Sequence, residues 1–225
     1  VNRLEDKRLL RGEARFIDDV TVPDMAAMAI LRSPHAHAWI TAIDLSKARN
    51  FAGVIDVFSA ADLGENLPLI PLRLTPYKDF ERFLQHPIAV DKVRFVGEPV
   101  AVVIAENRYI AEDALPQISV DYDILPAVTS RDQAAAGEVL VHDAAGENLA
   151  TRYTVSRGDL DDAFRDAPYT RRATFVTNRH APCPMETRGL VAEFDPAKPL
   201  LRLYGATKVT YFNRRHLAAA FDLPE

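Results

Sequence analysis

The first half of the chain consists of short apolar runs separated by turn residues. The runs lie at 26–31, 39–43, 54–58, 93–96, 100–105 and 118–122. Short runs of this kind, bounded by glycine, proline or asparagine, predict strands. Short helices are predicted at 46–50 and from Asn107, a favoured N-cap residue, to Leu115, where Pro116 ends the helix. This alternation of strands and helices predicts the α+β fold class.

Two stretches interrupt the alternation. The window 63–87 contains four prolines, which break every candidate helix. We expect a long irregular excursion that is functional or packs on a partner, with disorder as the alternative. Residues 131–149 are rich in alanine, glycine and acidic residues and have little apolar periodicity. We expect this stretch to be a linker between a domain at 1–130 and a second one at 150–225.

The second half of the chain has a different pattern. The segment from Ser156 to Asp159 fits a capping box that opens a short helix ending at Phe164. A terminal helix is predicted at 212–221, since Leu217 and Phe221 lie four residues apart and so share one face. Strands are predicted at 170–176, 190–194 and 200–204. No period of 20 to 50 residues repeats along the chain, which argues against solenoids and propellers.

Composition narrows the function classes. The chain has 225 residues, and its 27 basic against 32 acidic side chains give a net charge of −5, which argues against a nucleic-acid partner. The apolar fraction of 48% is that of a protein able to bury a core. The longest apolar run, 99–105, is far shorter than the roughly 20 residues that cross a bilayer. With no export signal in the sequence, we expect a cytoplasmic protein without a membrane partner.

Cysteine usage limits the metal chemistry. Cys183 is the only cysteine, which excludes an internal disulfide. It also excludes an iron–sulfur cluster or thiolate zinc site built by this chain alone, because such sites need about four ligands. Any centre of that kind must lie on a partner.

Two candidate sites have simpler interpretations. His35 and His37 lie two residues apart, so in a strand both imidazoles would point to the same side and could share a metal ion. No third ligand lies nearby, and we favour a turn whose imidazoles hydrogen-bond to backbone carbonyl groups. Glu98, between Gly97 and Pro99, could serve as a general base if buried. We favour a carboxylate that caps the turn.

A third candidate combines a thiol with an imidazole. His180, Cys183 and Glu186 are close in sequence, which suggests nucleophilic chemistry of the cysteine-protease kind. Pro182 and Pro184 flank the cysteine and hold it extended, away from any helix N-terminus that would activate the thiol. We therefore interpret Cys183 as a buried, inert thiol and keep a Cys183/His180 hydrolase as an alternative.

The glycine-rich phosphate motifs G-x-G-x-x-G and G-x-x-x-x-G-K-[ST] do not occur in the sequence. The chain is therefore neither a Rossmann nor a P-loop protein. Lys208, Arg214 and Arg215 cluster before and within the terminal helix. They could bind a phosphate or form a solvated face, and the residues alone leave both open.

A series of segments follows one order along nearly the whole chain. They are RLEDKRLLRG at 3–12, FIDD at 16–19, LRSPHAHA at 31–38, VRFVGEPVAV at 93–102, AEDA at 111–114, VDYDILPAV at 120–128, HAPCPMETRG at 180–189 and the stretch 217–225. Together they resemble the large subunit of the molybdenum hydroxylases, the family of xanthine dehydrogenase, aldehyde oxidase and aerobic carbon monoxide dehydrogenase. The resemblance implies an α/β hammerhead domain at 1–130 and the start of a molybdenum-cofactor-binding domain at 150–225.

The resemblance also implies a cofactor and partners. The cofactor is molybdenum-molybdopterin, with the cytosine dinucleotide form as a candidate, while [2Fe–2S] and FAD lie on separate iron–sulfur and FAD subunits. In the family, a hydroxyl on molybdenum, activated by a glutamate, attacks an electron-poor carbon while hydride passes to a sulfido ligand. That glutamate and a Gly-Gly-Gly-Phe-Gly segment would fall beyond Glu225. We therefore expect the remainder of the large subunit, or a separately encoded C-terminal part, to complete the site.

One site residue is implied by the resemblance. Thr207-Lys208 matches a Thr-Gln pair whose glutamine approaches an oxo ligand of molybdenum. Lysine keeps a hydrogen-bond donor but adds a positive charge and a longer reach. We expect Lys208 to bind the cofactor in a retuned site, with transfer of the role to another residue as the alternative, and we assign no catalytic residue or metal ligand to this chain.

These observations lead to one hypothesis and one main alternative. The chain is expected to enclose the cofactor and contact redox partners as part of a molybdenum-dependent oxidoreductase, and to be inactive alone. The alternative is a non-catalytic interaction module that kept the fold and lost the cofactor, for which Lys208 is the only hint.

Overall fold

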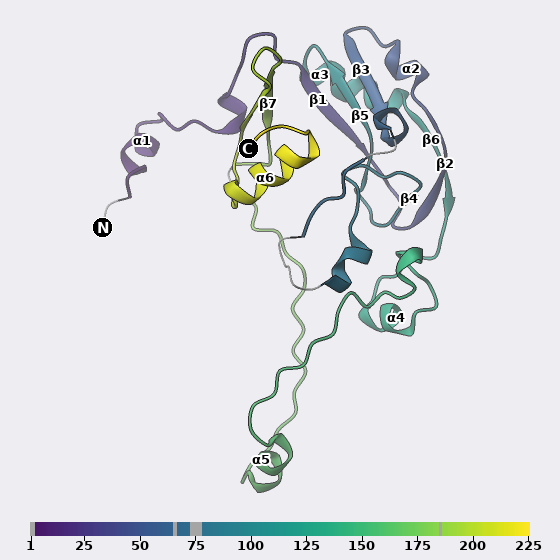
Figure 1. Ribbon diagram of the computed structural model, residues 1–225, viewed down its shortest axis with the longest axis vertical. Helices are drawn as coiled ribbons and strands as arrows, with labels where there is room; N and C mark the ends of the chain where they lie inside the picture. Colours follow the sequence, from purple (N-terminus) through teal and green to yellow (C-terminus); the bar gives the residue numbers. More distant parts are fainter. Residues whose placement is uncertain (1–2, 65–66, 73–77, 185) are drawn as a thin grey trace.

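The fold is described from a computed structural model, which covers residues 3–64, 67–72, 78–184 and 186–225. Its strands form two three-stranded antiparallel sheets and one hairpin (Figure 1). The first sheet has the order β1-β5-β3, the second has the order β4-β2-β6, and β7 pairs with β8. The strands are β1 Ala27–Arg32, β2 Ala38–Asp44, β3 Val54–Ser59, β4 Lys92–Val93, β5 Pro99–Ala105, β6 Ser119–Ile124, β7 Val191–Asp195 and β8 Leu200–Tyr204.

The helices are short and lie at the ends of the strands or outside the sheets. The α-helices are α1 Asp6–Leu10, α2 Ser46–Arg49, α3 Arg108–Ala114, α4 Arg131–Ala136, α5 Leu160–Asp166 and α6 Thr210–Ala220. The 3₁₀ turns are η1 Ile17–Asp19, η2 Ala60–Leu63, η3 Lys78–Phe83, η4 Leu115–Gln117 and η5 Asp143–Ala145. No helix in the described ranges is long and apolar enough to cross a membrane.

Strand β5 is the centre of the core. Its sequence, PVAVVIA, is apolar throughout because five of its seven residues are buried and neighbouring strands lie on both sides. Val103 pairs with Val57 of β3 and Ala29 of β1. Val57 and Val103 are completely buried, and they belong to the largest buried apolar cluster. We call residues 27–124, which contain both sheets, the two-sheet body.

Helix α3 covers the first sheet because its inner face is made of small residues. Ala111 and Ala114 are completely buried, which lets the helix approach β1 and β5 closely. The Asn107 side chain accepts a hydrogen bond from the Ile110 amide at 3.1 Å and begins the helix, as the sequence predicts. Gly53 has a φ of 81°, and a Cβ there would lie 2.6 Å from Ile110 Cδ1, so both backbone geometry and packing favour glycine.

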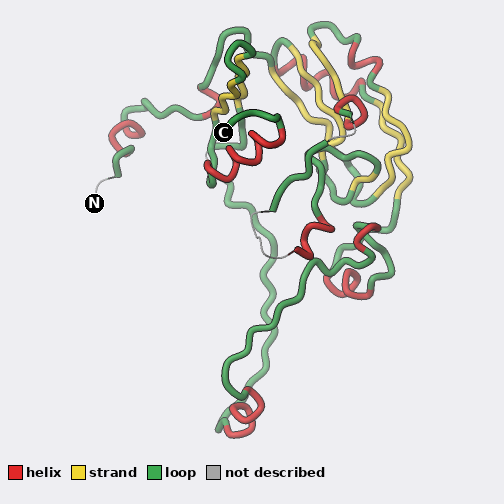
Figure 2. Tube along the Cα trace, viewed as in Figure 1, coloured by secondary structure: helices red, strands yellow, loops and turns green. Residues whose placement is uncertain are grey.

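Beyond the two-sheet body the chain is much less buried. The buried apolar residues of the described chain end at Ala145. Residues 150–184, which we call the arm, run out from the body and back again, with α5 at the tip (Figures 1 and 2). Outside α5 the arm contains no helix or strand. The β7–β8 hairpin and α6 follow it.

The α+β class and most predicted elements are confirmed, but two predicted strands are wrong. The strand expected at 93–96 is only the two-residue β4, because the Glu98 carboxylate takes the Arg94 amide that a longer ladder would use. The strand expected at 170–176 does not form. Its residues are exposed and no neighbouring strand satisfies its backbone, so β-propensity alone does not make a strand there.

Two local predictions in the second half of the chain also need correction. The cap of α5 is Asp159, whose carboxylate accepts from the Asp162 amide at 3.0 Å, and Ser156 lies upstream of the helix. The stretch 131–149 is not irregular throughout. A capping box between Ser130 and Gln133 begins α4 there. The domain boundaries themselves stay predictions.

The proline-rich window 63–87 contains η3 and otherwise irregular chain in its described part. Pro76 lies outside the described residues. Leu69 and Ile70, together with Pro87, line a cavity of about 700 Å³ whose other wall is α6, including Phe212 and Leu217. The excursion therefore lies against the terminal helix.

Candidate functional site

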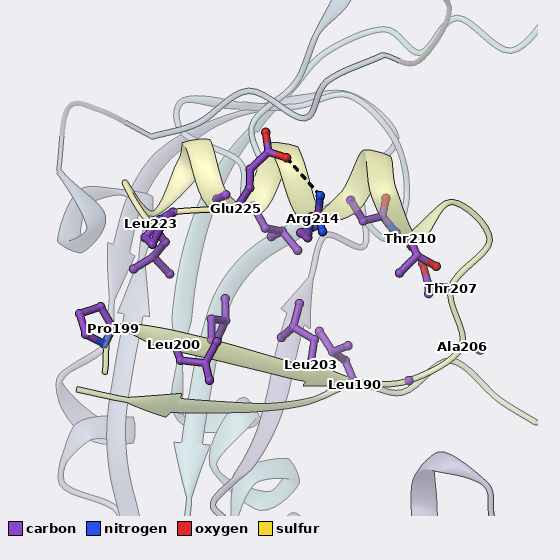
Figure 3. A pocket seen from close by; sticks show the side chains of 16 residues that line it. Leu190, Pro199, Leu200, Leu203, Ala206, Thr207, Thr210, Arg214, Leu223 and Glu225 are labelled. Atoms are coloured by element: carbon purple, nitrogen blue, oxygen red, sulfur yellow. Dashed lines mark hydrogen bonds and ion pairs between the residues drawn. The ribbon is translucent and has the colours of Figure 1, made fainter. Parts of the chain in front are cut away.

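The candidate site is a groove between the β7–β8 hairpin and α6 (Figure 3). Its volume is about 450 Å³. The hairpin supplies apolar side chains such as Leu200 and Leu203, which point toward α6 in Figure 3, and Leu217 of α6 also lines the groove. At one end the loop 205–209, which we call the β8–α6 loop, turns from the strand into the helix. The groove is thus an apolar slot with a polar loop at its end.

Close backbone contacts fix the start of the β8–α6 loop. A Cβ at Gly205 would lie 2.8 Å from the carbonyl oxygen of Gly189, which is closer than real Cβ atoms approach. Glycine therefore lets the end of β8 pass the chain that leads into β7. The loop is also tied to the helix, because Asn213 Nδ2 donates a hydrogen bond to Thr207 Oγ1 at 2.6 Å.

Lys208 lies in this loop, beyond the end of β8 at Tyr204. Its side chain is exposed and makes no hydrogen bond or ion pair within the described part of the chain. Thr207 lines the groove, whereas Lys208 is not among its lining residues. Lys208 therefore presents an exposed ammonium, without a partner in the described chain, next to the groove's polar end.

The two arginines of the predicted cationic cluster are paired. The Arg214 and Arg215 guanidinium groups lie 3.3 and 3.5 Å from the Glu225 carboxylate oxygens. Both guanidinium groups also lie over the Tyr211 ring, at 5.1 and 5.9 Å. The arginines are therefore paired with Glu225, whereas Lys208 forms no ion pair among the described residues.

The structure supports the predicted imidazole–carbonyl hydrogen bond for His37 but not for His35. His37 is buried, and its Nδ1 donates to the Pro126 carbonyl oxygen at 2.8 Å, since a carbonyl can only accept. The His35 ring instead contacts the Tyr122 ring edge-on, with 4.9 Å between centroids. Among the described residues, no group of three or more His, Cys, Asp or Glu side chains is placed to hold a metal ion.

Glu98 is the predicted turn cap. Its side chain is buried and accepts a hydrogen bond from the Arg94 amide. Burial raises the pKa of this carboxyl above its ordinary value, and the hydrogen bond from Arg94 opposes that shift. The Ser33 amide donates to the Glu98 carbonyl oxygen at 2.9 Å, so the turn also holds the β1 end of the sheet.

The predicted thiol–imidazole pair does not assemble. The prediction that Cys183 is buried is wrong: the thiol is exposed, and nothing in the described chain covers it. The prediction that the flanking prolines hold Cys183 extended is also wrong, because its φ of 45° lies in the left-handed region. His180 Nδ1 lies 3.2 Å from the Asn178 carbonyl oxygen. Glu186 accepts a hydrogen bond from the Ile17 amide at 3.1 Å, which ties the N-terminal segment to the second half. His180 and Glu186 therefore have separate partners, and neither is bonded to Cys183.

The sequence analysis missed a buried cation. Lys92 is only 1% exposed, and its ammonium lies 2.7 Å from Asp143 and 4.8 Å from the centroid of the Trp39 ring. The hydrogen bond from Lys92 lowers the pKa of Asp143, so this carboxylate stays ionised at neutral pH. This pair attaches the 131–149 stretch to the body. In the sequence, Lys92 is recognisable only as a lysine that precedes a strand valine. Its position opposite Trp39 of β2 appears only in the structure.

Comparison with known proteins identifies the family. The profile described as "Aldehyde oxidase and xanthine dehydrogenase, a/b hammerhead domain" matches residues 11–126, and the profile described as "Molybdopterin cofactor-binding domain" matches 141–225. The chain therefore belongs to the aldehyde oxidase and xanthine dehydrogenase family, and the expected hammerhead and partial cofactor-binding domains are confirmed.

The relatives are subunits of larger enzymes. The chain is 38% identical to the 6-hydroxypseudooxynicotine dehydrogenase complex subunit gamma of Paenarthrobacter nicotinovorans, and 34% identical to the carbon monoxide dehydrogenase large chain of Hydrogenophaga pseudoflava. These alignments cover 100% and 98% of this chain but 28% of each relative. Quinoline 2-oxidoreductase from Pseudomonas putida 86 superimposes with a TM-score of 0.88 and 37% identity, over 100% of this chain and 28% of that one.

The residues present fit part of a molybdopterin group. Lys208 offers an unpaired ammonium and Thr207 a hydroxyl on a loop fixed by backbone contacts, and such donors complement anionic oxygen atoms. The match at 141–225 supports molybdenum-molybdopterin as the cofactor. The chain spans 28% of the length of the relative named as subunit gamma.

Proposed function

We propose that the chain acts as the N-terminal portion of the large subunit of a molybdenum-containing hydroxylase or dehydrogenase. The observation that carries this proposal is the pair of family matches at 11–126 and 141–225, which follow the domain order expected from the sequence. The two-sheet body braces the cofactor-binding part, and the β8–α6 loop presents donors to the cofactor. When bound, the cofactor supplies the redox-active metal for oxidation of the substrate.

Lys208 is the chain's own contribution to this cofactor. Its ammonium is exposed and without an acidic partner in the described part of the chain, so it is free to donate to an anionic oxygen. Thr207 and Gly205 hold the loop so that this donor stays at the polar end of the groove. A lysine stabilises negative charge more strongly than a neutral amide would, and its flexible stem reaches further.

Partner subunits complete the electron path in this proposal. We propose an iron–sulfur subunit with [2Fe–2S] centres and an FAD subunit, and the cytosine dinucleotide form of the cofactor. The naming of one relative as a complex subunit and of another as a large chain supports a multi-subunit assembly. The cytoplasmic location stays a prediction.

Elemental analysis of the assembled complex tests the proposal. The large subunit containing this chain is purified with its partners, and molybdenum is measured per subunit. We expect stoichiometric metal, and acid hydrolysis should release cytidine monophosphate if the dinucleotide form is bound. A folded complex without molybdenum would instead support a non-catalytic module.

Variants at Lys208 test its role separately. Lys208→Ala should lower molybdenum occupancy at least about threefold, because it removes a charge-assisted hydrogen bond. Lys208→Gln should keep more metal than Lys208→Ala, because an amide still donates. Lys198→Ala, which changes an exposed lysine at the other end of the same hairpin, is the matched control. Equal occupancy in all three variants would remove Lys208 from the cofactor site.

A further inference from the structure

The tip of the arm has the features of a docking element. Helix α5 stands at the end of two extended limbs that carry it away from the two-sheet body (Figure 1). Every residue from Arg152 to Pro184 is exposed. The two limbs form no strand pairing with each other in the described chain. Nothing in this part of the protein therefore supports α5 by packing.

The sequence of α5 divides it into two faces. Leu160 and Phe164 are four residues apart and so lie on one side, and they are 66% and 60% exposed. Asp162 and Arg165 form an ion pair on the opposite side. Asp159, Asp161 and Asp166 add negative charge, so the tip is an acidic helix with a bare apolar stripe. Amphipathic helices of this kind bind in apolar grooves.

Helix α5 is too short to be stable in water without packing against another surface. It has seven residues, and an isolated helix shorter than about 12 to 15 residues is marginal in water. Its N-cap and its ion pair contribute only modestly, since both are exposed. Stable helix at this position therefore requires burial of Leu160 and Phe164 against another surface.

We propose that α5 docks through Leu160 and Phe164 into an apolar groove rimmed by lysine or arginine on a later part of the same large-subunit polypeptide. This inference rests on the proposed function, because it needs the longer subunit. The aligned region is 28% of the matched relative, so most of that subunit lies outside it. A surface on the same polypeptide is present at a high effective concentration, so even a short helix can remain docked there. The acidic residues of the tip favour a basic rim.

Hydrogen exchange in the complete large subunit tests this docking. We expect the amides of α5 to exchange at least about a hundredfold more slowly than the intrinsic rate of an unstructured peptide, because two large apolar side chains are buried. The variant Leu160→Ser/Phe164→Ser should lose most of this protection. The control Asp162→Asn/Arg165→Gln alters the opposite face and should keep it within about threefold.

Three outcomes would overturn the inference. The first is an unprotected α5 in a folded large subunit, and the second is protection that disappears on dilution, which indicates a second copy. The third is protection that appears only when the iron–sulfur or FAD subunit is added. Molybdenum content is measured on the same samples. A molybdenum-loaded subunit with an unprotected α5 refutes the docking alone, whereas a metal-free subunit with a protected α5 refutes the proposed function alone.

Discussion

At the scale of single residues, Gly205 is important for the groove because it has no side chain. Gly205 lets two backbone segments pass at a distance that no side chain tolerates, because its Cβ would sit 2.8 Å from a carbonyl oxygen. Sequence inspection singled out Lys208 beside it, since lysine has recognisable chemistry. It did not single out Gly205, because close backbone approach appears only in three dimensions.

Replacement of Gly205 by alanine should open the end of the β7–β8 hairpin. We expect the free energy of unfolding of the complete large subunit to fall by about 2 kcal/mol, because backbone has to shift to relieve the overlap. Thermal or denaturant unfolding measures the loss. Gly137→Ala is the control: its φ is 69°, but a Cβ there meets nothing within 4 Å, so we expect a loss of about 1 kcal/mol. Equal losses at the two sites would contradict the close-approach argument.

The buried Glu98 carboxyl should make the free energy of unfolding depend on pH. Burial raises the pKa of this carboxyl from its ordinary value of 4.5, so the folded state binds the proton more tightly than the unfolded state does. Its contribution to stability is therefore complete below pH 4.5 and is lost as the pH rises through the folded-state pKa. Glu98→Gln removes this titration while keeping an acceptor for the Arg94 amide.

The difference in unfolding free energy between wild type and Glu98→Gln, measured from pH 4 to pH 8, should therefore change in favour of the variant as the pH rises. Asp143 serves as the internal comparison, because the hydrogen bond from Lys92 lowers its pKa and its contribution is lost as the pH falls. A difference that does not change with pH would show that Glu98 titrates alike in both states.

At the scale of elements, predictions of strands from local sequence were correct where a neighbouring strand is present and wrong where none is present in the described chain. Strand β5 was predicted correctly because its apolar run is buried between two neighbours. The stretch 170–176 has a similar preference for strand but no neighbour in the described chain. Helix α4 was missed because its sequence is polar and its capping box, at Ser130 and Gln133, lies within a stretch interpreted as a linker.

The attachment of α4 and η5 to β4 gives a prediction at this scale. Asp143→Ala leaves the nearly fully buried Lys92 ammonium without its carboxylate, and we expect a loss of about 1–3 kcal/mol in unfolding free energy. Lys92→Met should cost less, because an apolar side chain of similar length fills the same space. Limited proteolysis should cleave 131–149 faster in Asp143→Ala than in wild type. Unchanged cleavage would mean that other contacts, such as those of Arg82 with Ala145 and Glu147, hold the segment.

At the scale of the whole molecule, the sequence was sufficient for the family and the order of its parts. The motifs are short contiguous sequences, so they can be recognised without a structure. The matches at 11–126 and 141–225 confirm the family that they indicate. The arm and the exposed thiol of Cys183 were not predictable in this way. Burial depends on what lies opposite a residue in the folded protein, and a local sequence motif does not carry that information.

The distribution of strand pairing has a consequence for biosynthesis. Every pairing in the two three-stranded sheets joins residues within 27–124, and none uses a residue from the second half. A nascent chain thus has a complete set of sheet partners as soon as this stretch has left the ribosome, before the second half of the chain has emerged. The pairing pattern therefore allows the two-sheet body to form without waiting for the second half of the chain.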